Sequence, residues 1–486
     1  MNRPIRTLAV GCFALFAMLL VNLNYVQVFQ ADNLNDKSDN KRARESECSR
    51  QRGPILVEGD TVARSVPSKD SLKFQRTYTS WPLYAPVTGF FSCIYGTSGV
   101  ESSENSILSG SDERLFVNRV IDLVGNEQPK GGSTLLTINP KAQQAAYDGL
   151  RALPGNTKGA VVALDPKTGA ILAMVSTPTY NPNLIATHDV DDAQRAWTRL
   201  TDNDPLKRMR NRTAQEIYPP GSTFKLVVAA AALSNGYSPD STVMGGTTLD
   251  LPQTTADLRN ENGSDCGGSE ISMSQALAVS CNVSFAKLGL ELGADTLQEQ
   301  AEMFGFNEDY LDELAMSPSN FPTELDDPST AFSAIGQYDV AATPLQMAMV
   351  VAGIANGGAV MKPYVVQEVR SPDLEVLDQA DPEVLHQAVS ASVADDLTQM
   401  MVGVVQNGTA TSLQLPDVPV AAKTGTANSS DEKAPYAWMV AFARADDPEV
   451  AVAVLVESTA VSRGEISGNQ IAGPIAGNVI KAVVQR

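Results

Sequence analysis

Residues 218–225 read Tyr-Pro-Pro-Gly-Ser-Thr-Phe-Lys and lead directly into the Ala-rich apolar run 226–233. The prolines and the glycine make this approach extended, whereas the run that follows is typical of a buried helix. Ser222 is therefore predicted at the start of a helix, one turn before Lys225 and on the same face. A helix start offers unpaired N–H groups and favours negative charge, so a serine there can attack a carbonyl while these groups hold the oxyanion.

Lys225 is the candidate base for this serine. A free lysine has a pKa of about 10.4, so Lys225 can accept a proton only if burial or a neighbouring cation lowers that pKa. The alternative for this stretch is a serine that merely caps an ordinary helix.

A second motif, Ser280-Cys281-Asn282, lies between two predicted helices. The hydroxyl and amide groups at such a bend can point into a cleft. Ser280 is a candidate to relay a proton to a leaving amine, and Asn282 a candidate to hold Lys225 or a substrate amide. Taken in isolation, the motif is better explained as a helix junction capped by Ser and Asn.

A third motif, Lys423-Thr424-Gly425-Thr426, ends a predicted strand. Lys423 and the two threonine hydroxyls are candidates to bind a carboxylate. Gly425 lacks a side chain, so a substrate backbone can lie alongside as an added strand. The N–H of Thr426 is then a candidate second oxyanion donor. The alternative is a strand end with a solvated lysine.

Each motif has a decoy elsewhere in the chain: Ser284–Lys287 is also Ser-x-x-Lys, Ser38–Asn40 is also Ser-x-Asn, and Lys167–Gly169 is also Lys-Thr-Gly. The motifs at 222, 280 and 423 run Ser-x-x-Lys, Ser-x-Asn, Lys-Thr-Gly from N to C. The order of the three motifs, rather than any one of them, carries the prediction.

The composition indicates a globular protein of two or three domains, with 486 residues, 43% hydrophobic and 19% charged. The formal net charge of −20 makes the chain a poor partner for nucleic acid. His188 and His386 are the only histidines, and the cysteine spacing does not match a zinc site. No metal and no cofactor are predicted.

The N-terminus predicts a membrane anchor. Arg3 and Arg6 precede an apolar run from 8 to 21, which interrupted apolar residues extend to Phe29. No small-x-small cleavage site follows, which favours an uncleaved single-pass anchor over a signal peptide. The charge before the run places the body outside the cytoplasm. A lipoprotein site at Cys12 is disfavoured, because the apolar stretch lies mostly after it.

Four cysteines remain outside the anchor: Cys48, Cys93, Cys266 and Cys281. An even number in an oxidising compartment predicts two disulfides. Proximity in the sequence favours Cys48–Cys93 and Cys266–Cys281.

The coarse pattern predicts an α+β fold. Two early strands and three late strands, separated by helices, indicate one antiparallel sheet that distant parts of the chain close. The predicted strands of this sheet are 160–164, 170–176, 419–423, 437–444 and 450–457. Before it, the pattern predicts strands at 55–57, 77–81 and 133–138, a loop at 98–111, and a helix from Pro140 to about 153. A terminal helix is predicted over 474–484.

Taken together, these residues resemble the penicillin-binding proteins, the D,D-transpeptidases that cross-link peptidoglycan. Residues 218–225 are similar to the family's nucleophile segment almost residue by residue. Similar matches occur at 336–337, 343–346 and 355–358, and at the first hairpin, 165–175. The resemblance implies a serine β-lactamase-like transpeptidase domain, with a five-stranded antiparallel sheet between helices and an all-helical subdomain.

The N-terminal part resembles the pedestal of the monofunctional, class B members through Arg52–Ile55 and the Gly-x-x-Gly-x-Glu pattern 96–101. The chain has no room for a glycosyltransferase domain, and the short pedestal with paired cysteines looks most like the actinobacterial elongation or septation type. The expected organisation is an anchor over 1–30, a pedestal or dimerisation domain over 31–155, and a transpeptidase domain over 156–486.

The resemblance also implies a mechanism and partners. Ser222 attacks the penultimate D-alanine carbonyl of a donor stem pentapeptide, D-alanine leaves, and an amine of an acceptor stem resolves the acyl-enzyme. β-Lactams acylate the same serine. A glycan polymerase of the SEDS family and the cell-wall synthesis complex are the implied protein partners.

Three rivals remain at this stage. A serine β-lactamase needs a general base for water, which the sequence does not identify, and does not need 150 extra N-terminal residues. A D,D-carboxypeptidase differs only in using water to resolve the acyl-enzyme. A β-lactam sensor or scaffold is the non-enzyme alternative, but a sensor needs a signalling module, and only about seven residues precede the apolar run.

Overall fold

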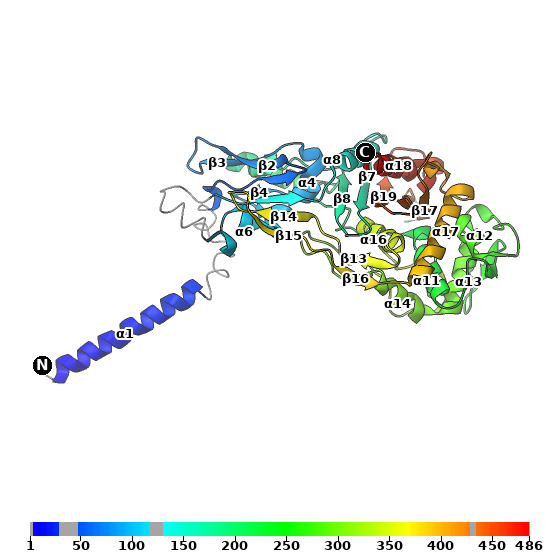
Figure 1. The fold of residues 1–486 in the computed structure, drawn as a ribbon, viewed down its shortest axis with the longest axis horizontal. Coiled ribbons are helices and arrows are strands. Elements are labelled where there is room, and N and C mark those ends of the chain that lie inside the picture. Colours follow the sequence, from blue (N-terminus) through cyan, green and yellow to red (C-terminus); the bar gives the residue numbers. More distant parts are fainter. Residues whose placement is uncertain (1–2, 29–46, 117–129, 428–433, 486) are drawn as a thin grey trace.

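The computed structural model describes residues 3–28, 47–116, 130–427 and 434–485. The decoy Ser38–Asn40 lies outside these ranges. Figure 1 shows an elongated body in which the N-terminal elements occupy one end and the helices α11 to α14 the other.

The larger part is built on one antiparallel sheet, as the sequence predicts. Its strand order, β17-β18-β19-β7-β8, places the three late strands beside the two early ones. The strands are β7 (Lys158–Leu164), β8 (Ile171–Thr177), β17 (Val420–Ala427), β18 (Tyr436–Ala443) and β19 (Val450–Ser458). Most of their residues are buried on both faces, which requires helices on both sides.

Helices cover the two faces of this sheet (Figure 1). The N- and C-terminal helices of this part pack against each other on one face, and a single apolar helix crosses the other. These helices are α8 (Pro140–Arg151) and α18 (Gly473–Val484) on the first face and α16 (Pro344–Ala355) on the second. Asn139 caps α8 by accepting from the N–H of Ala142 at 3.0 Å.

A helical subdomain stands against the β17 end of the sheet. Its centre is α11, in which every residue from Lys225 to Leu233 is buried. The helices are α11 (Lys225–Ser234), α12 (Met273–Ala278), α13 (Asn282–Leu292), α14 (Ala294–Met303), α15 (Asp327–Ser333) and α17 (Ala391–Asn407). Two short antiparallel ladders accompany them: β9 (Thr242–Met244) with β12 (Glu270–Ser272), and β10 (Thr248–Asp250) with β11 (Asp257–Arg259).

The N-terminal part has its own six-stranded sheet, and two of its strands come from far along the chain. The order is β15-β14-β6-β1-β2-β3, so the segment 366–379 completes a sheet begun by residues 55–78 and 133–136. The strands are β1 (Ile55–Val57), β2 (Asp60–Pro67), β3 (Phe74–Tyr78), β6 (Ser133–Leu136), β14 (Val366–Arg370) and β15 (Val376–Gln379). A single domain boundary at residue 155 would therefore assign strands of one sheet to two different domains.

Two local predictions in this part are wrong. The strand expected at 77–81 ends at Tyr78, and Trp81 opens helix α4 (Trp81–Thr88) with Pro at its second position. The loop expected at 98–111 contains helices α5 (Val100–Ser103) and α6 (Asn105–Leu108), which bury Ile107 and Leu108. Its polar composition concealed these turns because tertiary contacts, not helical periodicity, stabilise such short helices.

A buried charge network joins the strands and helices of this N-terminal part. The carboxylate of the fully buried Glu101 on α5 accepts hydrogen bonds from Arg52 Nε at 2.5 Å and Arg76 Nε at 2.6 Å. The hydroxyl of Tyr78 also donates to this carboxylate, at 3.1 Å. Burial alone would raise the pKa of Glu101, but the two guanidinium groups outweigh it and hold that pKa below its usual value. The carboxylate therefore stays ionised inside the pedestal.

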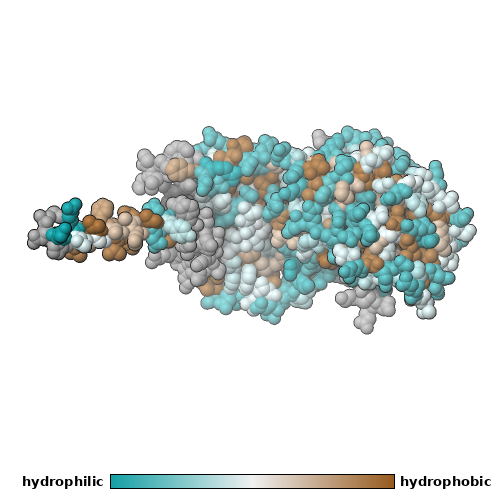
Figure 2. Space-filling view, turned by 90° about the horizontal axis from the view of Figure 1, so that it is seen from below, coloured by the Kyte–Doolittle hydropathy of each residue, from teal (hydrophilic) through white to brown (hydrophobic). Residues whose placement is uncertain are grey.

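The anchor prediction corresponds to helix α1 (Arg3–Val28). Residues Ile5–Val26 form a helix long and apolar enough to cross a membrane. Figure 2 shows apolar side chains along much of this helix, whereas the body presents a mixed and largely hydrophilic surface.

We expect Glu101→Ala to lower the free energy of unfolding of the full-length protein by about 3–5 kcal/mol. The change removes the carboxylate that pairs with the buried Arg76 and leaves the buried Arg52 with only the partly exposed Glu47. Urea denaturation followed by tryptophan fluorescence measures this loss. Glu47→Ala is the control, since Glu47 contacts Arg52 at 3.3 Å but is 26% exposed, and it should cost less than about 1 kcal/mol. Equal effects of the two variants would contradict the proposed role of the network.

Candidate active site

Ser222 lies in a short 3-10 turn, η2 (Gly221–Thr223), that leads into α11. Two glycines hold the turn in place: Gly221 has φ +52°, and its N–H donates to the carbonyl of Gly336 at 3.0 Å. A Cβ on Gly336 would lie only 2.2 Å from the Gly221 oxygen. The predicted helix start is thus a tighter turn, with the half-buried Ser222 one turn before Lys225.

Lys225 is fully buried and points toward the second motif. Its Nζ donates to the carbonyl of Ser280 at 2.7 Å, to the amide oxygen of Asn282 at 2.7 Å and to the Ser280 hydroxyl at 3.3 Å. Burial, and secondarily the nearby Lys423, hold the pKa of Lys225 well below its usual value. Burial and a neighbouring cation, the two effects that can leave a lysine neutral, are therefore both present.

Ser280 occupies the bend between α12 and α13 in a left-handed conformation, with φ +60°. This backbone, uncommon for a residue with a side chain, places its hydroxyl between the two lysines. Lys423 Nζ donates to the Ser280 hydroxyl at 2.8 Å and to the carbonyl of Thr424 at 2.9 Å. Burial lowers the pKa of Lys423 to about 7. The structure thus brings all three predicted motifs together.

The third motif lies inside β17 rather than at its end, and β17 is the edge strand of the sheet. Gly425 has a role that the sequence did not reveal. A Cβ there would meet the carbonyl oxygen of Pro220 and a methyl group of Thr223, each at 3.0 Å. The glycine therefore lets the strand approach the turn that carries Ser222.

Two grooves meet at Ser222, with volumes of about 510 and 400 Å³. Both share Ser222, Asn260, Glu261 and Thr426. The first, called here the aromatic groove, is otherwise lined by Arg259, Asn282, Phe332, Ile335, Gln337 and Tyr338. The second, called here the polar groove, contains Ser264, Ser280, Thr409, Thr424, Ser467 and Asn469.

Asn260 is a residue of this site that sequence analysis missed. It follows β11, is 6% exposed, and its amide oxygen accepts from the N–H groups of Asn282 at 2.9 Å and Val283 at 3.0 Å. Its amide nitrogen donates to the carbonyls of Gly246 at 2.7 Å and Ser264 at 2.8 Å. Asn260 therefore caps α13 from a separate segment and holds the Ser-Cys-Asn bend.

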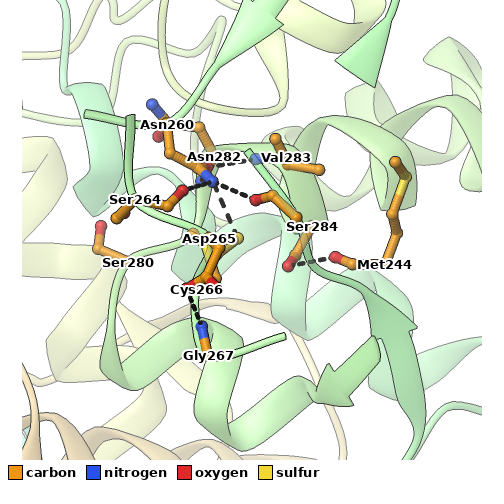
Figure 3. The surroundings of a disulfide bond; sticks show 12 residues. Met244, Asn260, Ser264, Asp265, Cys266, Gly267, Ser280, Asn282, Val283 and Ser284 are labelled. Carbon is orange, nitrogen blue, oxygen red and sulfur yellow. Dashed lines mark hydrogen bonds between the residues drawn. A yellow bond between two sulfur atoms is a disulfide. The ribbon is translucent and has the colours of Figure 1, made fainter. Parts of the chain in front are cut away.

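The predicted disulfide Cys266–Cys281 joins the same two segments, and Cys48–Cys93 is also formed. Figure 3 shows Asn260 and Ser280 on the segments that the Cys266–Cys281 bond connects. In addition, the side chain of Asn282 donates to the carbonyl of Arg259 at 3.2 Å. No sequence signal marks Asn260, because an asparagine in a polar Gly-rich loop is typical of any turn.

The decoys in the described part of the chain have structural roles. Ser284 is buried inside α13 and donates to the carbonyl of Met244 at 2.7 Å, while Lys287 turns outward to Glu291 at 3.3 Å. Lys167 sits in the turn between β7 and β8 and contacts Asp447 at 2.7 Å.

A family model described as the penicillin-binding protein transpeptidase domain matches residues 159–481. The chain belongs to this family. A second model, the penicillin-binding protein A dimerisation domain, matches residues 52–134. These two matches cover both of the sheets described above and support the resemblance that the motifs indicated.

Relatives of this penicillin-binding protein match over its whole length. The peptidoglycan D,D-transpeptidases PbpA of Mycolicibacterium smegmatis and Mycobacterium tuberculosis are each 42% identical, covering 100% of this chain and 99% of the relative. The ceftriaxone acyl-enzyme of penicillin-binding protein A from M. tuberculosis superposes with a TM-score of 0.87 at 42% identity, over 91% of this chain and 100% of that one. A D,D-transpeptidase domain from Eggerthella lenta superposes with a TM-score of 0.77 at 34% identity, over 90% of this chain and 99% of that one.

We expect Asn260→Ala to slow acylation by penicillin at least about tenfold, because a displaced Ser280 and Asn282 no longer hold Lys225. Stopped-flow or quench measurement with a fluorescent penicillin gives the rate. Asn139→Ala removes the cap of the distant α8, worth about 1 kcal/mol, and should leave acylation unchanged. Asn260→Asp keeps the acceptor oxygen and should recover part of the rate; equal rates for Asn260→Ala and Asn139→Ala would refute the positioning role.

The lowered pKa of Lys423 predicts a pH dependence. Its ammonium is present below about pH 7 and is lost above it, so the second-order rate of acylation by penicillin should fall by about tenfold per pH unit on the alkaline side, as the charged fraction does. Penicillin methyl ester lacks the carboxylate that Lys423 would bind, and its slower acylation should not show this decline. A rate for penicillin that stays constant to pH 9 would contradict the assignment.

Proposed function

We propose that this protein is a serine D,D-transpeptidase that cross-links peptidoglycan stem peptides through a Ser222 acyl-enzyme and is acylated by β-lactams. The observation that carries the proposal is the position of the Ser280 hydroxyl, 2.8 Å from Lys423 Nζ and 3.3 Å from Lys225 Nζ, in the cleft beside Ser222. The relatives described above, which are D,D-transpeptidases and a β-lactam acyl-enzyme, support the same reaction.

Activation of Ser222 follows from the protonation state of Lys225. A neutral amine has two N–H donors and one lone pair. Two oxygens, the Ser280 carbonyl and the Asn282 amide, lie at 2.7 Å and match the two donors. The lone pair then remains to take the proton of Ser222 as its oxygen attacks the penultimate D-alanine carbonyl of the donor.

The edge of β17 supplies a place for the donor peptide. Its backbone is paired with β18 on one side only, so an extended substrate can add as a further strand. In this pose the N–H of Thr426 and the N–H groups at the start of α11 stabilise the oxyanion. Lys423, with the hydroxyls of Thr424 and Thr426, binds the terminal carboxylate.

Departure of D-alanine requires a proton on its nitrogen. Ser280 delivers this proton and is resupplied by the lysines at either side of its hydroxyl. An amine of the acceptor stem then attacks the ester, and its proton returns through the same groups to Ser222. A D,D-carboxypeptidase, in which water replaces the amine, is the second candidate, since the acylation half is identical.

The remaining parts are proposed to place this site outside the cell membrane. Residues 1–30, with α1, would form a single-pass anchor, with the body extracytoplasmic. Residues 31–155 would form the pedestal or dimerisation domain, completed by β14 and β15, and 156–486 the transpeptidase domain. A SEDS-family glycan polymerase within the cell-wall synthesis complex is the proposed partner, on the strength of the class B resemblance.

We expect Ser222→Ala to abolish covalent labelling by a fluorescent penicillin without changing the thermal midpoint of the full-length protein, since Ser222 is only half-buried. Gel fluorescence after denaturation measures the labelling. Ser284→Ala, in the competing Ser-x-x-Lys sequence, costs about 1 kcal/mol of stability through one lost hydrogen bond and should keep full labelling. Persistent labelling of Ser222→Ala would refute the nucleophile.

The overall reaction is tested with the full-length protein in detergent, a stem pentapeptide donor and a second stem as acceptor. Mass spectrometry should detect a cross-linked dimer together with released D-alanine. If D-alanine is released and tetrapeptide forms without any cross-linked dimer, the protein is a D,D-carboxypeptidase and not a transpeptidase. Rapid turnover of penicillin would indicate a β-lactamase.

A further inference from the structure

We propose that Glu261 receives the ammonium group of the acceptor stem peptide in the polar groove, so that its charge selects a cationic amine over water for the second half-reaction. This inference rests on the proposed transpeptidase function and names the group that the acceptor must present.

The chemistry of the leaving group indicates where the acceptor binds. Ser280 and Thr424, which are assigned to the departing D-alanine, both line the polar groove. Once D-alanine has left, this groove lies empty beside the ester carbon of the acyl-enzyme. An attacking amine needs the same proton-transfer groups as the departing one, so it must enter through the polar groove.

The charge of this groove matches an ammonium ion. Among the described residues that line either groove, Glu261 is the one carboxylate. An alkyl amine with a pKa of about 10.4 arrives as a cation at neutral pH. It approaches a groove lined by Ser280, behind which the buried Lys225 and Lys423 lie. Glu261 is close enough to both lysines to raise the pKa of each by its charge. It therefore offsets the repulsion that an incoming cation would otherwise meet.

The backbone at Glu261 is held in place, whereas its side chain is exposed. It opens the short turn η3 (Glu261–Gly263) directly after the buried Asn260, whose four hydrogen bonds hold the backbone at this point. The Glu261 side chain is exposed, and within the described part of the chain no hydrogen bond or ion pair engages its carboxylate. A carboxylate without a partner at the edge of a cleft can bind an incoming cation without breaking an existing contact.

The reaction balances with these groups. The bound ammonium loses one proton to solvent, and its nitrogen then attacks the ester carbon. The new C–N bond forms as the C–O bond to Ser222 breaks, and the second nitrogen proton passes through Ser280 and Lys225 to the Ser222 oxygen. Glu261 binds and orients the acceptor and takes no part in bond making.

The test uses the full-length protein in detergent with the ester donor diacetyl-L-Lys-D-Ala-D-lactate and two amines. Glycinamide is largely cationic at neutral pH, whereas methoxyamine is uncharged. For each amine, chromatography gives the ratio of aminolysis to hydrolysis products. In Glu261→Gln this ratio should fall about three- to fivefold for glycinamide, the range expected for one exposed charge pair, with a raised KM for glycinamide. It should be unchanged for methoxyamine.

Two variants sharpen the test. Glu261→Lys should lower the glycinamide ratio further than Glu261→Gln. Glu270→Gln makes the same charge change on β12 of the same subdomain, outside both grooves, and should change neither ratio.

The outcomes separate the possible failures. Equal ratios for wild type and Glu261→Gln overturn the inference alone. Loss of hydrolysis and of both aminolysis reactions together would make Glu261 a general base and overturn it as well. A wild-type protein that is not acylated, or that only hydrolyses the donor, overturns the proposed function and with it this inference.

Discussion

The hydroxyl of Ser280, held between the buried amines of Lys225 and Lys423, is the interaction on which the site depends. Burial penalises the ammonium form of both lysines, and the charge of Lys423 lowers the pKa of Lys225 further. The result is a pair with lowered pKa values that share one hydroxyl. Such a pair can take a proton from a nucleophile and give one to a leaving group without a metal or a histidine.

The fold serves to hold these three groups at one point. Lys225 is fixed by the buried helix α11, Lys423 by the edge strand β17, and Ser280 by the bend between α12 and α13. The bend is the least regular of the three elements, and it receives the most local support. Asn260 caps the helix that follows it, and the Cys266–Cys281 bond ties it to the loop that carries Asn260. Glu261 lies on the same loop. The Asn260 hydrogen bonds and the Cys266–Cys281 bond therefore hold both the reacting groups and the edge of the polar groove in place.

The prediction of the fold from sequence succeeded where elements are long and periodic. The five strands of the central sheet, α8 and the terminal helix α18 lie where alternation and capping signals placed them. It failed where short segments depend on distant partners. Residues 98–111 look like a loop, yet they form two helices because Glu101 is buried against Arg52 and Arg76. Likewise, no local pattern shows that Val366 of β14 pairs with Leu136 of β6, some 230 residues earlier in the chain.

Residue type and spacing were enough to predict the candidate reacting side chains, their order along the chain, the class of protein and the pairing of the cysteines. The three-dimensional arrangement was needed to show which of the duplicated motifs face one cleft, why position 425 requires a glycine, and that Asn260 and Glu261 line that cleft. Burial, pKa shifts and close approach arise between segments that are far apart in the chain. A residue whose role is to hold or complement another segment carries no signal of that role in its own neighbourhood.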